Sequence, residues 1–346
     1  MRFLVTGTAG FVGFHMAGRL LGEGHAVTGF DAVTPYYDVA LKRRRLEALQ
    51  RRPGFHSIEA RLEDAGAVRS AFEAAEPEIV IHLAGQAGVR YSLDHPDAYA
   101  GANLVGMVNV LEACRAARPG HLLFSSTSSV YGMSAKPEFV ETDTTDRPVS
   151  LYAATKKSGE VMAHAYAHLF AIPTTVCRFF TVYGPNGRPD MAFFKFVRAI
   201  LDGEPIEVYG EGRQERDFTY VGDLVEAMRR LVDCVPQLGS PVRVPGVTDT
   251  LSPVAPYREV NIAGGTPIGL MRYIETIEEV LGKKALLKML PMQPGDVRRT
   301  TGSPDLLHAL TGYRPETSIR NGLQSFVDWL PGRGARQVAL TRDASR

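Results

Sequence analysis

A tyrosine and a lysine four residues apart, Tyr152 and Lys156, follow a run of hydroxyl side chains at residues 125–129. This spacing places both side chains on one face of a helix. A phenol titrates near pH 10, and a neighbouring ammonium lowers that pKa because it favours the phenolate. With Thr127 bonding the same oxygen, the set could move the proton of an alcohol that becomes a ketone. Alone, the pair is also typical of an ordinary surface helix.

A glycine-rich loop stands between the first strand, predicted at residues 2–6, and a helix predicted at residues 14–22. In such a Gly-x-x-Gly-x-x-Gly loop the first glycine permits a tight turn and the second lets backbone approach a pyrophosphate. The third lets the helix pack closely on the strand, and the helix N-terminus supplies amide donors to the phosphates. The loop residues expected to contact the cofactor are Gly7, Gly10, Phe11, Val12 and Gly13.

A second strand at residues 25–31 ends in an acid, Asp31. A carboxylate there would bond the adenosine ribose hydroxyls and repel a 2′-phosphate, so NAD is favoured over NADP. A later strand at residues 79–84 leads into a loop of small residues, 85–92, and Leu83 is expected to border the cofactor. The alternative is a plain βαβ unit in which the acid is solvated.

Composition indicates an ordinary globular enzyme of 346 residues with a formal net charge of +1. That charge gives no reason to expect nucleic acid as a partner. The three cysteines, Cys114, Cys177 and Cys234, are widely spaced and odd in number. They favour a reducing, cytoplasmic location without a disulfide framework or a metal site. The chain opens on a strand and lacks a long apolar run, so neither a signal peptide nor a membrane partner is expected.

Two polar features of the sequence are interpreted as structural rather than functional. The four consecutive cations at residues 42–45 are typical of a solvated helix face. Asn103, at the start of a predicted helix, is expected to satisfy local backbone rather than to contact substrate.

In combination, these motifs identify a resemblance. Over roughly residues 1–330 the chain resembles the nucleotide-sugar epimerase branch of the extended short-chain dehydrogenase/reductase superfamily. The matching motifs are Gly7-x-x-Gly10-x-x-Gly13, the hydroxyl run before Val130-Tyr-Gly132, Tyr152-x-x-x-Lys156, Arg178-Phe-Phe and Arg216-Asp217-Phe. Within that branch the chain is most similar to the UDP-glucuronate 4-epimerases. The stretches that carry this similarity are Tyr36-Tyr-Asp-Val, Gln86-Ala-Gly-Val-Arg90-Tyr-Ser92, Gly187-Arg188-Pro-Asp-Met-Ala192 and Leu290-Pro-Met-Gln-Pro-Gly-Asp296-Val.

The resemblance implies an α/β fold: a Rossmann-type, doubly wound parallel sheet with a smaller C-terminal α/β substrate lobe. Residues 1–180 would form the NAD-binding domain, to which a segment near residues 215–235 returns. Residues 181–330 would mostly form the lobe for the UDP-sugar. Residues 331–346 are polar and are expected to be a disordered tail.

The resemblance also implies residue roles. Tyr152 would be the acid and base at the sugar 4-OH, and Thr127 would bond the 4-oxygen. Lys156 would lower the pKa of Tyr152 and hold the nicotinamide ribose, so Tyr152 and Lys156 also count as cofactor contacts. The residues expected to hold the hexuronate carboxylate are Ser128, Ser129, Thr181 and Arg188. The remaining substrate contacts would be Arg90, with Arg216 and Asp296 facing the UDP. The alternative for Arg188 is a structural cation that closes its loop on Asp190.

The implied activity is NAD-dependent 4-epimerisation of a UDP-hexuronate, UDP-glucuronate to UDP-galacturonate, through a transient 4-keto sugar. A homodimer is expected, paired through the helices near residues 103–117 and 152–169. The alternatives are a UDP-glucuronate decarboxylase and a neutral UDP-hexose 4-epimerase. A 4,6-dehydratase is disfavoured because serines follow Thr127 where that enzyme needs an acidic pair. A non-enzymatic NAD-binding regulator is disfavoured because Thr127, Tyr152 and Lys156 are intact.

The chain departs from the pattern of this branch at several positions. Relatives usually carry an aspartate before the adenine ring, where this chain has Arg61. Gly85 and Gly101 replace larger residues, and Asn186 stands where an aromatic is usual. These departures are candidates for a different adenine contact or a somewhat different sugar.

Overall fold

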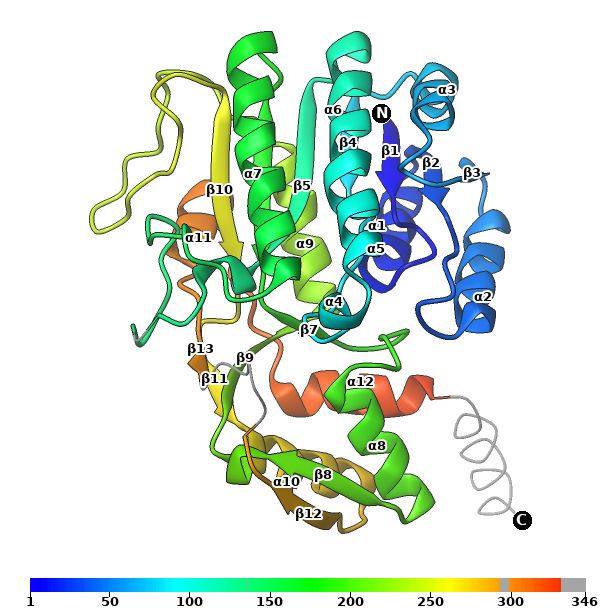
Figure 1. The fold of residues 1–346 in the computed structure, drawn as a ribbon, viewed down its shortest axis with the longest axis vertical. Coiled ribbons are helices and arrows are strands. Elements are labelled where there is room, and N and C mark those ends of the chain that lie inside the picture. Colours follow the sequence, from blue (N-terminus) through cyan, green and yellow to red (C-terminus); the bar gives the residue numbers. More distant parts are fainter. Residues whose placement is uncertain (135, 293–298, 331–346) are drawn as a thin grey trace.

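The larger body of the protein is a parallel sheet between two layers of helices (Figure 1). The computed structural model describes residues 1–134, 136–292 and 299–330, so Asp296 and the predicted tail lie outside the described residues. The seven strands follow the order β10-β6-β5-β4-β1-β2-β3. They are β1 (Arg2–Thr6), β2 (Ala26–Asp31), β3 (Phe55–Glu59), β4 (Ile79–His82), β5 (His121–Thr127), β6 (Thr174–Phe179) and β10 (Tyr257–Ile262). The predicted doubly wound fold is confirmed.

The central strands β1, β4 and β5 carry apolar side chains on both faces. In β1, Phe3 and Val5 pack into one core cluster, whereas Leu4 between them packs into the other. Successive side chains of a strand point to opposite faces, so a sheet covered on both sides requires apolar residues at every position. This is why these central strands contain short continuous apolar runs in the sequence, whereas the edge strand β3 is mixed.

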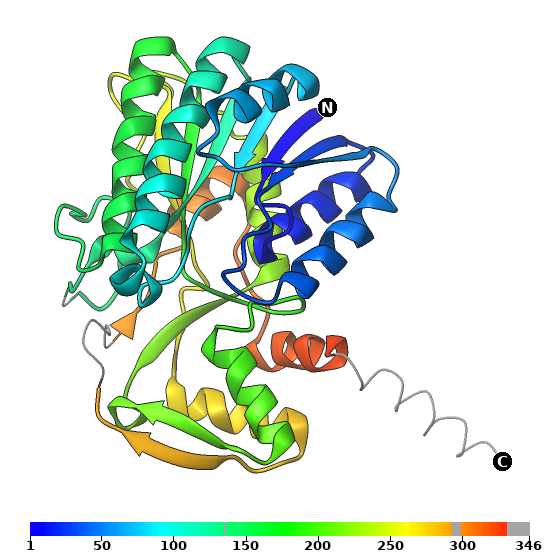
Figure 2. The ribbon, with the colours of Figure 1, turned by 45° about the vertical axis from the view of Figure 1, so that its right-hand side comes forward.

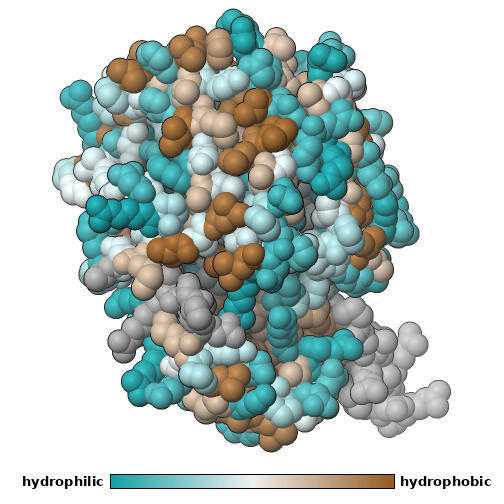
Figure 3. Space-filling model, viewed as in Figure 1, coloured by the Kyte–Doolittle hydropathy of each residue, from teal (hydrophilic) through white to brown (hydrophobic). Residues whose placement is uncertain are grey.

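Helices cover both faces of the large sheet. One layer is formed by α3 (Ala65–Ala75), α6 (Gly106–Ala117) and α7 (Leu151–Phe170), and it lies in front in Figure 1. The other is formed by α1 (Phe11–Gly22), α2 (Val39–Gln50), α9 (Val221–Val232) and α11 (Asp305–Thr311). Apolar side chains are also visible on the outer surface over α6 and α7 (Figure 3). Besides α9, both β10 and α11 come from the range 181–330 and join this larger body.

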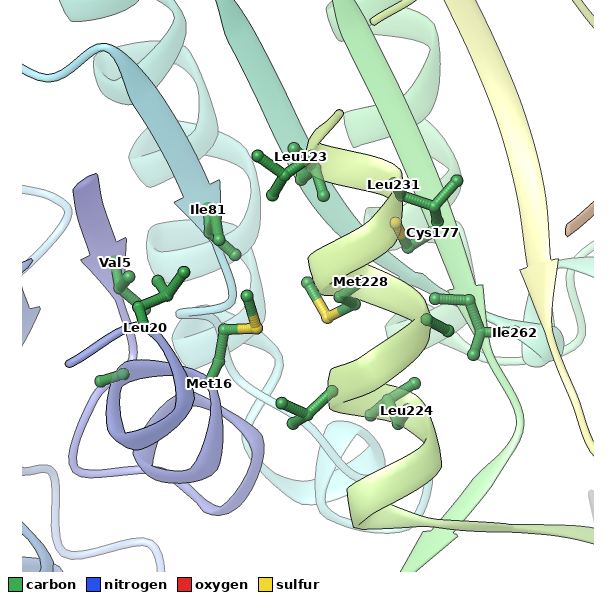
Figure 4. Packing of buried hydrophobic residues seen from close by; sticks show 14 of the residues in the cluster. Val5, Met16, Leu20, Ile81, Leu123, Cys177, Leu224, Met228, Leu231 and Ile262 are labelled. Carbon is green, nitrogen blue, oxygen red and sulfur yellow. The ribbon is translucent and has the colours of Figure 1, made fainter. Parts of the chain in front are cut away.

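The core between the sheet and the second layer depends on α1 and α9. Figure 4 shows Met16 and Leu20 of α1 facing Leu224 and Met228 of α9, with strand residues beside them. Leu224, Met228 and Leu231 follow helical spacing and are fully buried. This packing holds α1, whose first turn follows the glycine-rich loop, against the sheet.

The smaller body lies below the carboxyl ends of the large sheet (Figure 2). Its helices are α8 (Ala192–Asp202), α10 (Leu270–Leu281) and α12 (Ile319–Trp329), and β8 (Pro205–Tyr209) pairs with β12 (Leu286–Leu290). A small sheet joins the two bodies: β7 (Thr181–Tyr183), β9 (Glu215–Tyr220), β11 (Pro267–Gly269) and β13 (Arg299–Thr300). Two short helices, α4 (Tyr91–Asp94) and α5 (Pro96–Tyr99), lie in the loop after β4.

Asp217 of β9 organises the junction between the bodies. Its buried carboxylate accepts hydrogen bonds from the backbone amides of Gly264 (2.9 Å), Gly265 (3.0 Å) and Gly302 (3.2 Å). The first two glycines follow β10, and the third follows β13. The Arg216-Asp217-Phe motif therefore includes a structural residue that fixes two connections.

Among the described residues, no helix has both the length and the apolar character to cross a bilayer.

Replacement of Leu224 by alanine tests the packing of α9. Leu224 is fully buried, so we expect the free energy of unfolding to fall by about 2–5 kcal/mol. Chemical denaturation measures this change. Leu238 is 55% exposed, and Leu238→Ala should change stability by less than about 0.5 kcal/mol. Equal effects of the two substitutions would contradict the packing described here.

Candidate active site

A cavity of about 650 Å³ lies at the carboxyl ends of the central strands. It runs from the glycine-rich loop to the hydroxyl run after β5 and on to the loop after β7. Its wall includes the predicted site residues Gly7, Gly10, Phe11, Val12, Gly13, Asp31, Leu83, Thr127, Ser128, Ser129, Tyr152, Thr181 and Arg188. The structure thus places these predicted cofactor and proton-transfer residues around one space, whereas Lys156 is not among the lining residues.

All three glycines of the loop, Gly7, Gly10 and Gly13, stand where a Cβ would lie less than 3.0 Å from a backbone atom. Gly7 has φ +82°, and a Cβ there would lie 2.9 Å from the backbone nitrogen of Ala84. A Cβ on Gly13 would lie 2.0 Å from the carbonyl oxygen of Gly7. Helix α1 can therefore approach β1 closely, and its N-terminus borders the cavity at Gly10. Amides at such a terminus fit the pyrophosphate of a dinucleotide.

Asp31 stands at the end of β2 beside this loop. Its carboxylate accepts hydrogen bonds from the amides of Ala9 (2.9 Å) and Val33 (2.8 Å). Burial raises the pKa of Asp31, while these amide bonds lower it. Each oxygen keeps a second lone pair for a ligand, so this position in the cavity wall fits the ribose hydroxyls of NAD.

Three hydroxyls cluster where β5 ends. Thr127 lies in extended backbone, and its oxygen accepts a hydrogen bond from the amide of Ser129 (3.2 Å). Its hydroxyl also donates to the Ser129 oxygen at 3.2 Å. This cap begins a single 3₁₀ turn, which places Ser128 and Ser129 along the cavity wall.

Tyr152 lies in the first turn of α7, where Ser150 caps the helix through the amide of Ala153 (3.1 Å). Burial raises the pKa of the Tyr152 phenol, whereas the Thr127 side chain and the charge of Arg188 lower it. Thr127 and Arg188 are thus the groups that oppose the effect of burial on the pKa of Tyr152. The predicted effect of Lys156 on this pKa stays a prediction.

Lys156 is buried one helical turn after Tyr152. Burial lowers the pKa of its ammonium to about 8, although the carboxylate of Glu160 acts in the opposite direction. Glu160 itself accepts two hydrogen bonds from Arg178, at 3.0 and 2.9 Å, and one from Ser126 at 2.5 Å. Glu160 is therefore the buried counter-charge behind the lysine, and Arg178 of the Arg178-Phe-Phe motif holds that carboxylate in place.

Asn103 bonds backbone, but that of Gln86 in the loop after β4 rather than the predicted local backbone. Its side chain accepts from the amide of Gln86 (2.8 Å) and donates to the Gln86 carbonyl (3.0 Å) and to Thr155 (3.0 Å). A Cβ on Gly85 would lie 2.8 Å from the Asn103 oxygen. The closeness of the Asn103 side chain thus explains why position 85 is a glycine.

Two further departures from the family pattern meet at the cofactor end of the cavity. Arg61 and Glu63 line the wall there and form an ion pair of 2.7 Å. A Cβ on Gly101 would lie 3.1 Å from the Glu63 carboxylate. The charge of Arg61 is therefore compensated within the same short segment.

Arg188 borders the cavity from the loop between β7 and α8. It pairs with Asp190, at 3.1 Å from Nε to Oδ1 and 2.5 Å from Nη2 to Oδ2. This is the loop-closing contact that the sequence left open as an alternative. The two interpretations are compatible, because the paired guanidinium also lines the cavity.

The interpretation of residues 42–45 as a solvated helix face is wrong for half of them. Arg43 and Arg44 are exposed, but Lys42 and Arg45 are 6% and 1% exposed. Positions three apart share a helix face, and this face of α2 points inward. Lys42 lines the cavity and donates to the carbonyl of Thr34 (2.8 Å). The apolar Leu46 and Leu49 on the same face were the available signal.

Arg45 connects two walls of the cavity. Nη1 donates to the carbonyl of Ala9 and to the hydroxyl of Tyr37, both at 2.8 Å. Nη2 donates to the carbonyls of Asn186 (2.7 Å) and Gly187 (3.3 Å). The glycine-rich loop and the Arg188 loop are therefore attached to one buried side chain, which the sequence analysis did not assign to the site.

Two predicted substrate residues do not line the cavity. Arg90 precedes α4 and stacks over the ring of Tyr209 at 5.4 Å. Arg216 lies in β9 and donates to the carbonyl of Glu215 (3.0 Å). The third predicted UDP contact, Asp296, lies outside the described residues.

The fold and this cavity define a class: a nicotinamide-dinucleotide protein of the extended short-chain dehydrogenase/reductase type, with a tyrosine and a lysine at the end of the cofactor site. Sequence comparison agrees. The profile of the NAD dependent epimerase/dehydratase family matches residues 3–241. The chain belongs to this family, which confirms the resemblance and NAD as the cofactor.

Individual relatives are similar over nearly the whole chain. A probable UDP-glucuronate 4-epimerase of Rhizobium meliloti (strain 1021) is 58% identical over 329 residues, which cover 95% of this chain and 96% of that protein. UDP-glucuronate 4-epimerase 1 of Arabidopsis thaliana is 42% identical over 331 residues, 94% of this chain and 76% of that protein. The crystal structure of a Bacillus cereus UDP-glucuronic acid 4-epimerase with UDP-glucuronic acid and NAD has a TM-score of 0.84 at 30% identity, covering 95% of this chain and 98% of that chain.

Replacement of Arg45 by methionine tests the connection between the two loops. Three backbone carbonyls lose a charged donor, so we expect the free energy of unfolding to fall by about 2 kcal/mol or more. NAD affinity should fall as well, because Ala9 lies in the glycine-rich loop. Denaturation and calorimetric titration with NAD measure both effects. Arg44→Met, at an exposed position of the same helix, is the control and should change neither. A wild-type NAD affinity in Arg45→Met would contradict the connection.

Proposed function

We propose that this protein interconverts UDP-glucuronate and UDP-galacturonate by transient oxidation at C4. The observation that carries the proposal is the wall shared by Thr127, Tyr152 and Arg188. The first two provide a proton-transfer site for an alcohol, and the third provides a cation for a sugar carboxylate. The names of the similar proteins from Rhizobium and Arabidopsis point to the same substrate.

The protein groups divide the chemistry between them. Tyr152 takes the proton of the 4-OH and returns it, and Thr127 bonds the 4-oxygen throughout. Lys156 holds the nicotinamide ribose and favours the phenolate. Bound NAD supplies the reversible acceptor for the hydride that leaves C4 and returns to the opposite face of the ring. Because NAD is regenerated in each cycle, it can remain tightly bound.

A uronate brings a hazard that the carboxylate site would control. The 4-keto intermediate is a β-keto acid, which loses carbon dioxide when the C5–carboxylate bond aligns with the carbonyl π system. Arg188, with hydroxyls from Ser128, Ser129 and Thr181, would hold the carboxylate away from that alignment. A decarboxylase shares the first oxidation but requires the aligned geometry. A neutral-hexose epimerase has no use for Arg188.

The two bodies would divide the ligands. We assign NAD to residues 1–180 together with about 215–235, and the UDP-sugar mostly to residues 181–330, with Arg216 facing the UDP. We further infer a cytoplasmic location, which the three free cysteines Cys114, Cys177 and Cys234 favour.

Incubation of the purified protein with UDP-glucuronate, read by proton NMR, tests the activity. We expect UDP-galacturonate to appear toward an equilibrium mixture. Tyr152→Phe should lose more than about 99% of the turnover, since general acid–base catalysis contributes 10²-fold or more. The variant should still bind NAD in a calorimetric titration. A UDP-pentose with carbon dioxide would indicate a decarboxylase, and substantial turnover by Tyr152→Phe would exclude that residue as the base.

We also propose a homodimer paired through α6 and α7. Exposed apolar side chains lie on the outer surface of these helices and at Val105, directly before α6: Val105 (50%), Val108 (38%), Val161 (58%) and Leu169 (67%). Figure 3 shows apolar patches on this face. An apolar area of this kind on adjacent helices suits a two-fold interface, where each copy presents the same surface.

Substitution of Val161 by glutamate tests the interface. A charge that must be buried in each copy should shift the protein toward monomer. Analytical ultracentrifugation at micromolar concentration measures the change. Leu238→Glu, at an exposed position away from these helices, should leave the mass unchanged. A monomeric wild-type protein would rule out the dimer.

A further inference from the structure

Two side chains of the cavity wall, Tyr36 and Arg188, form a closed hydrogen-bonded set with Asp190 behind them, which we call the Arg188 cluster. Arg188 donates from Nε and Nη2 to the two carboxylate oxygens of Asp190. Nη2 also donates to the hydroxyl of Tyr36 (3.2 Å), and that hydroxyl donates to Asp190 Oδ2 (3.2 Å). Each member is thus bonded to both of the others.

The cluster is almost neutral before a ligand arrives. The side chains of Arg188 and Asp190 are 19% and 29% exposed. Burial raises the pKa of Asp190, but the Arg188 guanidinium outweighs this and holds the pKa below its ordinary value. Asp190 is therefore an anion at neutral pH, and its charge cancels that of Arg188, which lines the cavity.

One edge of the guanidinium remains for a ligand. The hydrogen bonds of Arg188 to described residues use Nε and Nη2, so the two hydrogens of Nη1 are left. A ligand carboxylate that reaches Arg188 must share one guanidinium with Asp190. Its attraction is then weaker than the attraction of an uncompensated cation would be.

Tyr36 fixes the cluster from the cofactor side. It belongs to the loop between β2 and α2, and its ring lies 4.7 Å from that of Tyr91. Its hydroxyl is so close to Gly88 that a Cβ there would lie 2.3 Å away. Since Gly88 and Tyr91 lie in the loop after β4, the orientation of Arg188 depends on two loops of the larger body.

We propose that Asp190 and Tyr36 are positioning residues that set how strongly this site prefers a sugar carboxylate. Asp190 occupies one edge of Arg188 and cancels its charge, and Tyr36 fixes the direction in which the free edge points. The proposal rests on the proposed role of Arg188 as the carboxylate contact, and adds that the contact is moderated by a carboxylate of the protein itself.

The physical consequence concerns neutral sugars. With Asp190 present, a hexose without a carboxylate leaves Arg188 paired, so its binding carries no penalty from an unpaired buried cation. Without the Asp190 charge, a neutral hexose would enclose an uncompensated guanidinium, which is costly. A uronate would instead become the main counter-charge of Arg188.

Asp190→Asn tests this, because asparagine keeps the shape and one acceptor but removes the charge. We define the selectivity ratio as the Kd for UDP-glucose divided by the Kd for UDP-glucuronate. Both constants are measured by calorimetry with saturating NAD in a Tyr152→Phe background, so that no turnover occurs. We expect Asp190→Asn to raise the ratio about tenfold or more. Tyr36→Phe keeps both charges but removes the hydroxyl that orients the guanidinium. This variant should lower the ratio by weakening uronate binding alone.

Asp202→Asn is the matched control. It makes the same chemical change in an exposed ion pair of α8, with Arg198 at 3.0 Å, and should leave the ratio unchanged. An unchanged or lower ratio in Asp190→Asn overturns the proposal, whatever the wild-type ratio is. The NMR assay on the unsubstituted protein separates the cases: UDP-galacturonate formation with an unchanged ratio refutes only the role of Asp190. No formation of UDP-galacturonate refutes the proposed function instead.

Discussion

The common direction of the strands in the large sheet is the constraint on which the site depends. Because β1, β4 and β5 run parallel and in register, their carboxyl ends meet at one edge. Thr127 is the last residue of β5, and Gly7 and Leu83 directly follow β1 and β4. The three residues come from distant parts of the sequence. The cavity therefore lies at this edge, where the strand order reverses between β1 and β4.

The sequence was sufficient wherever function depends on local geometry. A glycine pattern between a strand and a helix, an acid at a strand end and a Tyr–Lys pair four residues apart each require one element and its neighbour. The structure places Gly13 against Gly7, Asp31 beside Ala9, and Tyr152 one turn from Lys156. For these residues the expectation from the chain alone matches the position that the fold provides.

The rest depends on contacts between residues far apart in the chain, which spacing does not reveal. Arg45 bonds the carbonyl of Asn186, 141 positions away, and Tyr36 bonds Asp190, 154 positions away. Arg45 belongs to the run of cations that suggested a solvated face, and Tyr36 lies in the loop before that run. The same limit applies to Arg90, whose motif matched but whose guanidinium lies over Tyr209. Helical spacing alone could have separated the buried Lys42 and Arg45 from the exposed Arg43 and Arg44.

The way the backbone passes between the two bodies has a mechanical consequence. The chain crosses after β6, β9, β10 and β13 and again after α11, and Asp217 fastens two of these crossings. A hinge works best where few segments must bend together. Here a wide opening would have to flex several segments at once and break the amide bonds to Asp217. Substrate exchange should therefore proceed by small local movements of loops at the rim, while the two bodies keep their mutual orientation through the catalytic cycle.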